Sequence, residues 1–175
     1  MRFKVGFGYD VHQLAEGEEL VIGGIKIQHS KGTIAHSDGD VLIHAICDAL
    51  FGAANMRDIG FHFSDTDSEF KNIDSKILLK KTLELIKTKG FQISNIDSTI
   101  CLQKPKISPY IEQMQKTLSN VLELDMDDVS IKATTTEKLG FVGKEEGISA
   151  YATVLIFKNW KNEKNFSFRS KFKPR

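Results

Sequence analysis

The sequence predicts an α/β (α+β) sandwich, in which helices cover one face of a mixed four-stranded sheet and a small hairpin lies near the N-terminus. Three observations lead to this fold class. Apolar residues alternate with a period of two in several short stretches, they recur with a helical period in three longer stretches, and the two kinds of stretch follow one another along the chain. Such an order favours one sheet packed against one layer of helices.

The N-terminal segment supplies a strand and the hairpin. Aromatic residues and valine alternate with small or polar residues over residues 3–9, which predicts a strand. The pair Gly23-Gly24 divides residues 20–27 into two β-rich halves, which is typical of a hairpin.

Residues 41–54 have the spacing of a helix. Ser37 followed by Asp40 matches a capping box, so we expect the helix to begin there. At 100° per residue, His44 lies on the half of the helix opposite the apolar stripe, together with Cys47 and Phe51. We therefore expect that His44 is not a core residue.

The later elements are predicted by the same periods and by glycine and proline signals. In chain order they are a long loop over 56–72, a helix over 74–89 closed by Gly90, a strand over 91–103, a helix over 107–124, and strands over 129–135 and 148–157. A long ordered loop such as 56–72 tends to carry function.

Composition limits the class of protein. The chain has 175 residues, which fits a single domain, and we assign this domain to residues 1–157. Residues 158–175 hold seven basic side chains and one acidic one, and we expect a disordered basic extension there. The net charge of +1 favours neither nucleic acid nor an anionic membrane as a partner.

The location expected from the sequence is the cytoplasm. The N-terminus has no signal-like apolar segment, and no apolar run reaches the roughly 18 residues that span a bilayer. A plastid-type organelle is the alternative if a transit peptide has been removed.

One candidate metal site combines residues from the first strand and the first helix. Asp10 and His12 are two positions apart, so their side chains project from the same face of a strand. With His44 they provide two imidazoles and one carboxylate, the ligand set of an open, catalytic zinc site. Asp48, one turn after His44, could accept the other ring N–H of His44 or contact a substrate hydroxyl.

A second candidate site is the run Thr134-Thr135-Thr136-Glu137 after a predicted strand. Three hydroxyls beside a carboxylate suit a phosphate chain held by Mg²⁺, which proteins bind through one or two carboxylates and phosphate oxygens. The competing interpretation is structural, because threonine is common at the ends of strands.

Several longer motifs occur together in one order. They are Gly8-Tyr9-Asp10-Val11-His12, Ala35-His36-Ser37-Asp38-Gly39-Asp40-Val41, His44-Ala45, Asp48-Ala49-Leu50, Asp58-Ile59-Gly60, Asp65-Thr66-Asp67, Pro105-Lys106 and the run from Ala133 to Phe141. Through these motifs the chain resembles the cyclodiphosphate synthase family of the non-mevalonate isoprenoid pathway, from Val5 to about Phe157.

The resemblance implies an enzyme that uses metal ions. It places Zn²⁺ on Asp10, His12 and His44, and a second divalent ion, Mg²⁺ or Mn²⁺, on Glu137. The implied reaction is an attack of the 2-phosphate of 4-diphosphocytidyl-2-C-methyl-D-erythritol 2-phosphate on its own β-phosphorus, which closes a cyclic diphosphate and releases cytidine monophosphate. The implied assembly is a homotrimer with active sites between subunits.

The resemblance also implies roles for individual side chains. His36 and Thr135 match positions that stabilise the transition state. The implied substrate contacts are Ser37, Asp48, Asp58, Gly60, Phe63, Asp65, Asp67, Lys71, Thr134, Thr136, Phe141 and Lys144. The implied cytidine pocket consists of Leu102, Gln103, Lys104, Pro105, Lys106, Ile107 and Ser108.

The chain departs from the family pattern at Lys144, where many members have arginine and where lysine cannot form a two-pronged bond to phosphate. Two other functions compete with the cyclase: a zinc-dependent nucleotide phosphohydrolase, and a non-catalytic module that zinc stabilises.

Overall fold

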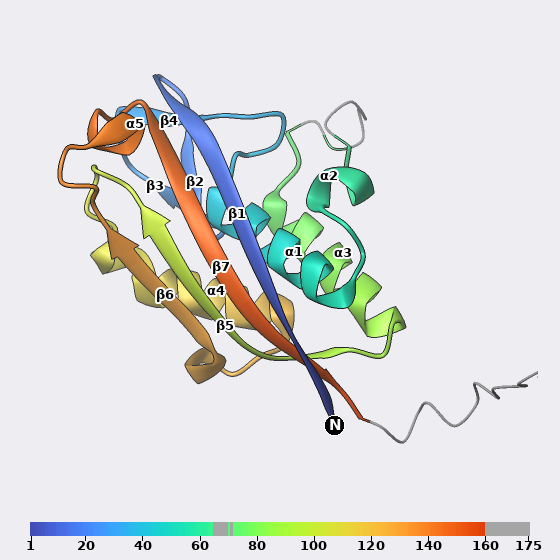
Figure 1. Ribbon diagram of the computed structural model, residues 1–175. Coiled ribbons are helices and arrows are strands. Elements are labelled where there is room, and N and C mark those ends of the chain that lie inside the picture. Colours follow the sequence, from blue (N-terminus) through green and yellow to red (C-terminus); the bar gives the residue numbers. More distant parts are fainter. Residues whose placement is uncertain (65–69, 71, 160–175) are drawn as a thin grey trace, which may run out of the picture.

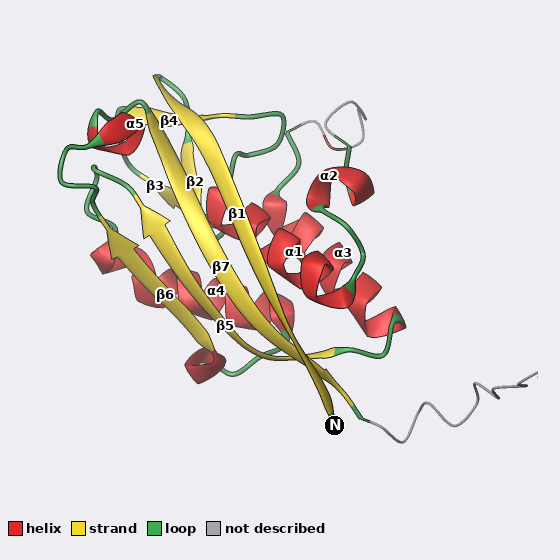
Figure 2. Ribbon diagram, viewed as in Figure 1, coloured by secondary structure: helices red, strands yellow, loops and turns green. Residues whose placement is uncertain are grey.

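The structure is a computed structural model that describes residues 1–64, 70 and 72–159. It has two layers, a twisted sheet and a set of helices that cover one face of it (Figures 1 and 2). The strands are β1 (Arg2–Glu16), β2 (Leu20–Ile22), β3 (Ile25–Ile27), β4 (Lys31–Ile34), β5 (Gln92–Cys101), β6 (Val129–Thr134) and β7 (Gly147–Lys158). The helices are α1 (Val41–Ala54), α2 (Ile59–His62), α3 (Ser75–Thr88), α4 (Ile111–Leu122) and α5 (Gly140–Gly143), with short 3-10 turns at Ser108–Tyr110 and Met126–Asp128.

The main sheet has the strand order β4-β1-β7-β5-β6, and β2 and β3 form a separate hairpin. β1 is antiparallel to β4 and β7, β7 is antiparallel to β5, and β5 is parallel to β6. The sandwich, the mixed sheet and the hairpin agree with the prediction. The sheet has one strand more than the predicted four, because the short segment β4 pairs with the end of β1.

β1 is also longer than the predicted strand over residues 3–9. It continues through Asp10, His12 and Gln13, where polar side chains interrupt the apolar pattern, and its pairing with β7 extends to Gln13 opposite Gly147. Backbone pairing to β7 therefore holds this polar segment in the sheet, which confirms that Asp10 and His12 lie on the first strand.

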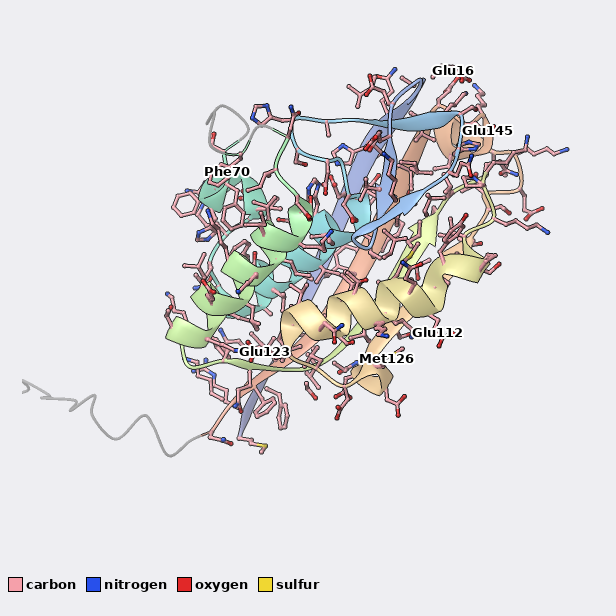
Figure 3. All side chains as sticks on the ribbon, turned by 180° about the vertical axis from the view of Figure 1, so that it is seen from behind. Glu16, Phe70, Glu112, Glu123, Met126 and Glu145 are labelled. Carbon is pink, nitrogen blue, oxygen red and sulfur yellow. The ribbon has the colours of Figure 1, made fainter. Side chains whose placement is uncertain are left out.

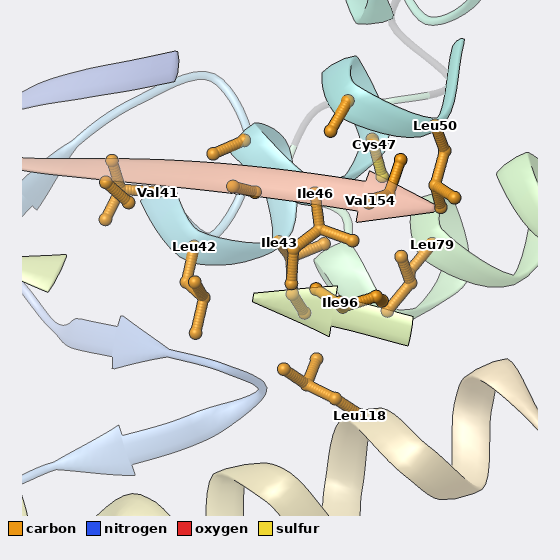
Figure 4. Close-up of a cluster of buried hydrophobic side chains, with 14 of the residues drawn as sticks. Val41, Leu42, Ile43, Ile46, Cys47, Leu50, Leu79, Ile96, Leu118 and Val154 are labelled. Carbon is orange, nitrogen blue, oxygen red and sulfur yellow. The ribbon is translucent and has the colours of Figure 1, made fainter. Parts of the chain in front are cut away.

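Helix α1 forms the centre of the core, between the sheet and α3 (Figure 4). Its bounds confirm the prediction, but the division of the helix into an apolar and a polar half was wrong for two residues. Cys47 and Phe51 are completely buried, because α3 and the segment with α2 cover the side of α1 that faces away from the sheet. On this helix His44 and Asp48 are half-buried and Gly52 is exposed, while the other residues are buried.

The N-cap of α1 is Asp40 and not Ser37 as the capping-box pattern predicted. The Asp40 carboxylate accepts hydrogen bonds from the backbone N–H groups of Ile43 (3.0 Å), Gly23 (2.9 Å) and Gly24 (2.6 Å). Burial raises the pKa of Asp40 to about 6, although these hydrogen bonds oppose the shift. One carboxyl group thus fixes both the start of α1 and the turn of the β2–β3 hairpin.

Two glycines allow α1 to lie directly on β1. A Cβ atom at Gly6 would be 1.9 Å from the carbonyl oxygen of Ala49, and one at Gly8 would be 2.0 Å from that of Ala45. The even-numbered residues of β1 therefore face the helices. The odd-numbered ones face away from them and leave a row of large apolar side chains exposed, namely Phe3, Val5, Phe7, Tyr9 and Val11.

The remaining helices close the covered face of the sheet. Figure 3 shows α4 from the helix side, with Glu112 and Glu123 near its two ends, while Met114 and Leu118 on its inner face are buried. Gly90 follows α3 with a φ of 76°, which confirms the predicted left-handed turn after this helix. None of the helices within the described residues is long and apolar enough to cross a membrane.

Candidate active site

Asp10, His12 and His44 converge on one point at the junction of β1 and α1. Asp10 Oδ2 is 3.0 Å from both His12 Nε2 and His44 Nδ1, and the two ring nitrogens are 3.1 Å apart. Alternation along β1 points Asp10 and His12 toward the helices, where the first turn of α1 presents His44. In the described part of the chain, these three residues are the group whose ligand atoms could hold a metal ion together.

The charges at this point stabilise one another. Burial alone raises the pKa of Asp10, but hydrogen bonds to His12 and His44 and their positive charges lower it well below its usual value. Burial lowers the pKa of His44, yet the hydrogen bond and the charge of Asp10 leave it above its usual value. A carboxylate that stays ionised beside two imidazoles is the donor set that binds a divalent cation such as Zn²⁺.

The sequence suggested that Asp48 accepts the other ring N–H of His44, but the structure does not show this contact. Instead, His44 Nε2 lies 3.0 Å from Ser75 Oγ and 3.2 Å from Ser37 Oγ. Asp48 accepts a hydrogen bond of 2.7 Å from the backbone N–H of Ile59, and therefore holds the start of α2 against α1.

A cavity of about 310 Å³ opens beside the triad. Its lining comes from β1, α1, α2, α3 and the segments between them. It consists of His12, Ala35, His36, Ser37, His44, Ile59, Gly60, Phe63, Ser64, Phe70, Ile73 and Leu78. Of the predicted substrate contacts and catalytic residues, it brings together His36, Ser37, Gly60 and Phe63. Asp65, Asp67 and Lys71 lie outside the described residues.

Helix α2 forms one wall of this cavity, within a segment that was predicted as a loop. It begins at Asp58, whose Oδ1 accepts a hydrogen bond of 2.9 Å from the N–H of Phe61. His62 in the same turn stacks on Phe51 with ring centroids 4.1 Å apart, and its Nε2 lies 2.8 Å from the carbonyl oxygen of Met56. The four-residue helix gave no periodic signal because it is too short to show one.

A second cavity, of about 150 Å³, lies at the ends of β5 and β6. Its lining consists of Leu102, Gln103, Pro105, Lys106, Ile107, Ser108, Ala133, Thr134 and Thr135. The two stretches meet because β5 and β6 are parallel neighbours, and the N–H of Leu102 donates to the carbonyl oxygen of Thr134 at 3.0 Å. The cavity therefore gathers the predicted cytidine stretch, except for Lys104, beside two residues of the threonine run.

Lys104 turns away from this cavity and pairs with Glu145, its Nζ lying 3.0 Å from Glu145 Oε1. Glu145 follows α5 directly after Lys144, which is exposed. The segment around α5, which also carries the exposed Phe141, is thereby tied to the stretch predicted to bind cytidine.

The threonine run has its own internal hydrogen bonds. Thr135 Oγ1 donates to Glu137 Oε1 at 2.7 Å, and Thr136 Oγ1 donates to the carbonyl oxygen of Leu139 at 2.7 Å. Thr134 Oγ1 donates to the carbonyl oxygen of Thr135 at 3.0 Å. Glu137 has a φ of 51° and is exposed, so its carboxylate stands out from the end of β6.

Within one chain the two cavities are separate. Asp10 pairs with Ala150, Ala150 pairs with Ile100, and Ile100 pairs with Ala133 across four adjacent strands. Three inter-strand spacings place the first and last residues of this row about 14 Å apart. The cavities share no lining residue among those described, and the single chain does not bring Glu137 to the triad.

A sequence profile of the YgbB family matches residues 3–157. The chain belongs to the YgbB family. The 2-C-methyl-D-erythritol 2,4-cyclodiphosphate synthase of Bacteroides fragilis is 69% identical over 156 residues, which cover 89% of this chain and 98% of that protein. The synthase of Bacteroides thetaiotaomicron is 66% identical over 159 residues, which cover 91% of this chain and all (100%) of that protein.

Several solved structures have the same fold as this chain. A 2C-methyl-D-erythritol-2,4-cyclodiphosphate synthase in a form bound to CDP superimposes with a TM-score of 0.82 at 32% identity, over 88% of this chain and 100% of that chain. The IspF of Plasmodium falciparum in complex with CDP superimposes with a TM-score of 0.78 at 35% identity, over 90% of this chain and 97% of that chain. The bifunctional IspDF of Campylobacter jejuni superimposes with a TM-score of 0.85 at 41% identity, over 89% of this chain and 42% of that longer chain.

Two residues of this YgbB-family site were given no role by the sequence. Asp38 belongs to one of the family motifs, and Ser75 is the first residue of a predicted amphipathic helix, but no pattern in the sequence indicates a function for either. Asp38 accepts hydrogen bonds from the N–H and the hydroxyl of Ser75, directly behind His44. The only signal for Ser75 was the cap residue Asp74 before it, which predicts a helix start and no contact with another element.

Proposed function

We propose that this chain is an enzyme that converts 4-diphosphocytidyl-2-C-methyl-D-erythritol 2-phosphate to 2-C-methyl-D-erythritol 2,4-cyclodiphosphate and cytidine monophosphate. The observation that carries this proposal is the open Asp10–His12–His44 triad at the mouth of a cavity of about 310 Å³. The printed names of relatives that are 66–69% identical support the same reaction. The substrate is phosphorylated and polar, and we place the reaction in the cytoplasm.

In the proposed reaction one phosphorus–oxygen bond forms and another breaks. An oxygen of the 2-phosphate forms a bond to the β-phosphorus, and the bond from the β-phosphorus to the oxygen that bridges it to the α-phosphorus breaks. The electron pair of that bond leaves with cytidine monophosphate. Because the attacking phosphate is already an anion, the site needs no serine or cysteine nucleophile, and its task is to align three phosphates and to offset their repulsion.

Two divalent ions fit the residues present. Asp10, His12 and His44 would hold Zn²⁺, and Glu137 would hold Mg²⁺ or Mn²⁺ together with phosphate oxygens. Bound ions of this kind neutralise phosphate charge and polarise the phosphorus that is attacked. The ionised Asp10 between two imidazoles supports the first assignment, and the exposed carboxylate of Glu137 beside Thr135 supports the second.

The side chains of the first cavity suit the erythritol phosphate end of the substrate. His36 and Ser37 line the cavity next to His44 and can donate hydrogen bonds to phosphate oxygens. The backbone of Gly60 forms the opposite wall, and Asp58 at the start of α2 can accept from a substrate hydroxyl. Asp48 holds this wall in place through the N–H of Ile59.

The side chains of the second cavity suit the cytidine end. Backbone and side-chain groups of the 102–108 stretch surround it, and the hydroxyls of Thr134 and Thr135 lie at its rim. The Thr135 hydroxyl can turn from Glu137 to a phosphate oxygen that shares an ion with this carboxylate. The CDP complexes among the related structures agree with a nucleotide ligand of this size.

The separation of the two cavities supports a homotrimer with sites between subunits. The residues that would hold the two ions must reach the phosphates of one substrate, whereas within a chain the triad and the threonine run are about 14 Å apart, three strand spacings. A neighbouring subunit can supply the second half. The exposed apolar row of β1 and the exposed Tyr151 on the same face offer a contact surface that a monomer rarely leaves in water.

Phosphorus NMR of the purified protein with the substrate, Zn²⁺ and Mg²⁺ tests the reaction. We expect the coupled signals of a cyclic diphosphate together with cytidine monophosphate. Release of inorganic phosphate would instead identify the phosphohydrolase, and unchanged substrate would refute both activities. If removal of zinc unfolds the protein, the metal is structural, as in the non-catalytic module.

Mixing two inactive variants tests the shared site. His44→Ala removes a ligand from the first half, and Glu137→Gln removes the carboxylate from the second half. In a randomly mixed trimer, about one interface in four combines two intact halves, so about a quarter of the wild-type activity should return. No recovery after joint refolding would show that each site lies within one chain.

A further inference from the structure

A buried serine, Ser75, and a half-buried aspartate, Asp38, stand directly behind the metal-ligand candidate His44. The carboxylate of Asp38 accepts the backbone N–H of Ser75 at 2.9 Å through Oδ2, and it accepts the Ser75 hydroxyl through Oδ1. Ser75 is fully buried, with 0% of its surface exposed, and its Oγ lies 3.0 Å from His44 Nε2. The pair joins the segment before α1 to the first residue of α3.

The hydrogen-bonding capacity of these groups fixes the direction of each bond. A serine hydroxyl has one hydrogen to donate, and in Ser75 that hydrogen goes to Asp38, whose carboxylate can only accept. Toward His44, the Ser75 oxygen can therefore only accept. It follows that His44 Nε2 carries a hydrogen in this contact. The ring is thereby held with Nδ1 3.0 Å from Asp10 Oδ2 and 3.1 Å from His12 Nε2, so Nδ1 is the nitrogen that would bind a cation once the hydrogen that it donates to Asp10 is released.

We propose that Ser75 and Asp38 are positioning residues that hold the His44 ring in the tautomer and orientation required to bind a divalent cation through Nδ1. Metal-binding histidines commonly donate their second N–H to such a partner, and removal of the partner weakens metal binding by roughly tenfold to a hundredfold. The inference depends on the proposed function only in that Asp10, His12 and His44 are taken as metal ligands.

Ser37 is the competing acceptor, since its Oγ lies 3.2 Å from His44 Nε2. Its geometry suits this role less well. The Ser37 oxygen already accepts the backbone N–H of Gly39 at 3.2 Å, and among the residues that the structure describes no carboxylate takes its hydrogen in a contact like that between Ser75 and Asp38. Ser37 is also half-buried at the wall of the cavity, where its hydroxyl can turn toward a ligand.

The test is a competition titration of Zn²⁺ between the intact, metal-stripped protein and a chromophoric chelator, without substrate. Ser75→Ala should weaken zinc binding by roughly tenfold to a hundredfold, and Asp38→Asn by a smaller factor, because an amide oxygen still accepts from Ser75. Thr82→Val is the matched control. It removes another fully buried hydroxyl from the same helix, one that donates to the carbonyl oxygen of Leu78 far from the ligands along α3.

The outcomes separate positioning from general destabilisation. The proposal predicts full zinc affinity in Thr82→Val, even if its metal-free melting temperature falls as much as that of Ser75→Ala. It is overturned if Ser75→Ala binds zinc like the wild type, or if Ser37→Ala shows the loss instead. A wild type that binds no zinc would refute the metal assignment itself, whereas a failure of the cyclisation assay with normal zinc binding would leave this inference intact.

Discussion

Replacement of Gly8 by alanine should separate the two elements that form the metal site. Gly8 lies on β1 two residues before Asp10, and its Cα faces the backbone of α1 one residue away from His44, at Ala45. A Cβ atom there would be 2.0 Å from the Ala45 carbonyl oxygen, whereas ordinary contacts begin at 3.4 Å. The atoms of α1 nearest to this Cβ all belong to the backbone, and the backbone of β1 fixes the Cβ position. No side-chain rotation can therefore relieve the overlap.

The size of the effect follows from this distance. Strand and helix must move apart locally by about 1.4 Å, the difference between the required and the available distance. Overpacking of this kind costs about 3 kcal/mol, which in a chain of this length lowers Tm by about 10 °C. A metal site tolerates changes of only about 0.2 Å in its ligand distances, so zinc affinity should fall as well.

The assay combines thermal denaturation of the metal-stripped protein with a zinc titration, and Gly52→Ala provides the control. Gly52 lies on the same helix, but a Cβ atom there would meet nothing closer than the Phe7 carbonyl oxygen at 4.0 Å. This variant should keep its zinc affinity and gain about 0.5–1 kcal/mol, because alanine favours a helix more than glycine does. If Gly8→Ala matched Gly52→Ala in both measurements, the close approach of β1 and α1 would not hold the site together.

Three further variants test individual side chains. His44→Ala should keep its circular dichroism spectrum, since an open metal site is catalytic, but lose turnover by at least about a hundredfold in the phosphorus NMR assay; global unfolding would contradict the open site. Asp48→Ala should raise KM by about tenfold or more because α2 loses its anchor at Ile59, and Asp48→Asn, which keeps an acceptor, should recover part of the loss. The pKa of Asp40 is about 6 in the folded protein and about 4 in the unfolded chain, so between these pH values the folded state binds more protons. The free energy of unfolding should therefore fall by up to about 3 kcal/mol as pH rises from 4 to 6. Urea denaturation in chelator should show this slope in the wild type and a smaller one in Asp40→Asn, where Asp48, whose pKa burial also raises, still contributes in the same direction. An equal slope in the two proteins would refute the raised pKa of Asp40.

Helices and strands whose apolar residues recur at a regular spacing could be predicted from the sequence. Strands that form only because a neighbouring strand pairs with them could not. Helix α1 has its predicted bounds because fourteen residues show a helical period between a cap and a turn. Strand β4 has only four residues with a glycine among them, and it exists because the end of β1 offers it a free edge. The burial of Cys47 and Phe51 depends on α3 and on the segment with α2, which no local pattern on α1 can reveal.

The same distinction holds for the candidate site. The spacing of Asp10 and His12 on a strand predicts that they point the same way, and the structure brings His44 to them. Which hydroxyl or carboxylate supports His44 depends on how α3 begins, so Ser75 could not be found and Asp48 was the nearest choice along the helix. The distance between the triad and Glu137 follows from strand order, which a single sequence does not state.

The alternation along β1 makes this strand sensitive to insertions and deletions. Its even-numbered residues approach α1 and carry Asp10 and His12, while its odd-numbered residues form the exposed apolar row. Loss of one residue before Asp10 would reverse the facing of every position on one side of the gap. In a library of natural or laboratory variants, replacements of Phe3 or Val5 by other large apolar residues should therefore be common, whereas single-residue length changes between Gly6 and His12 should be almost absent.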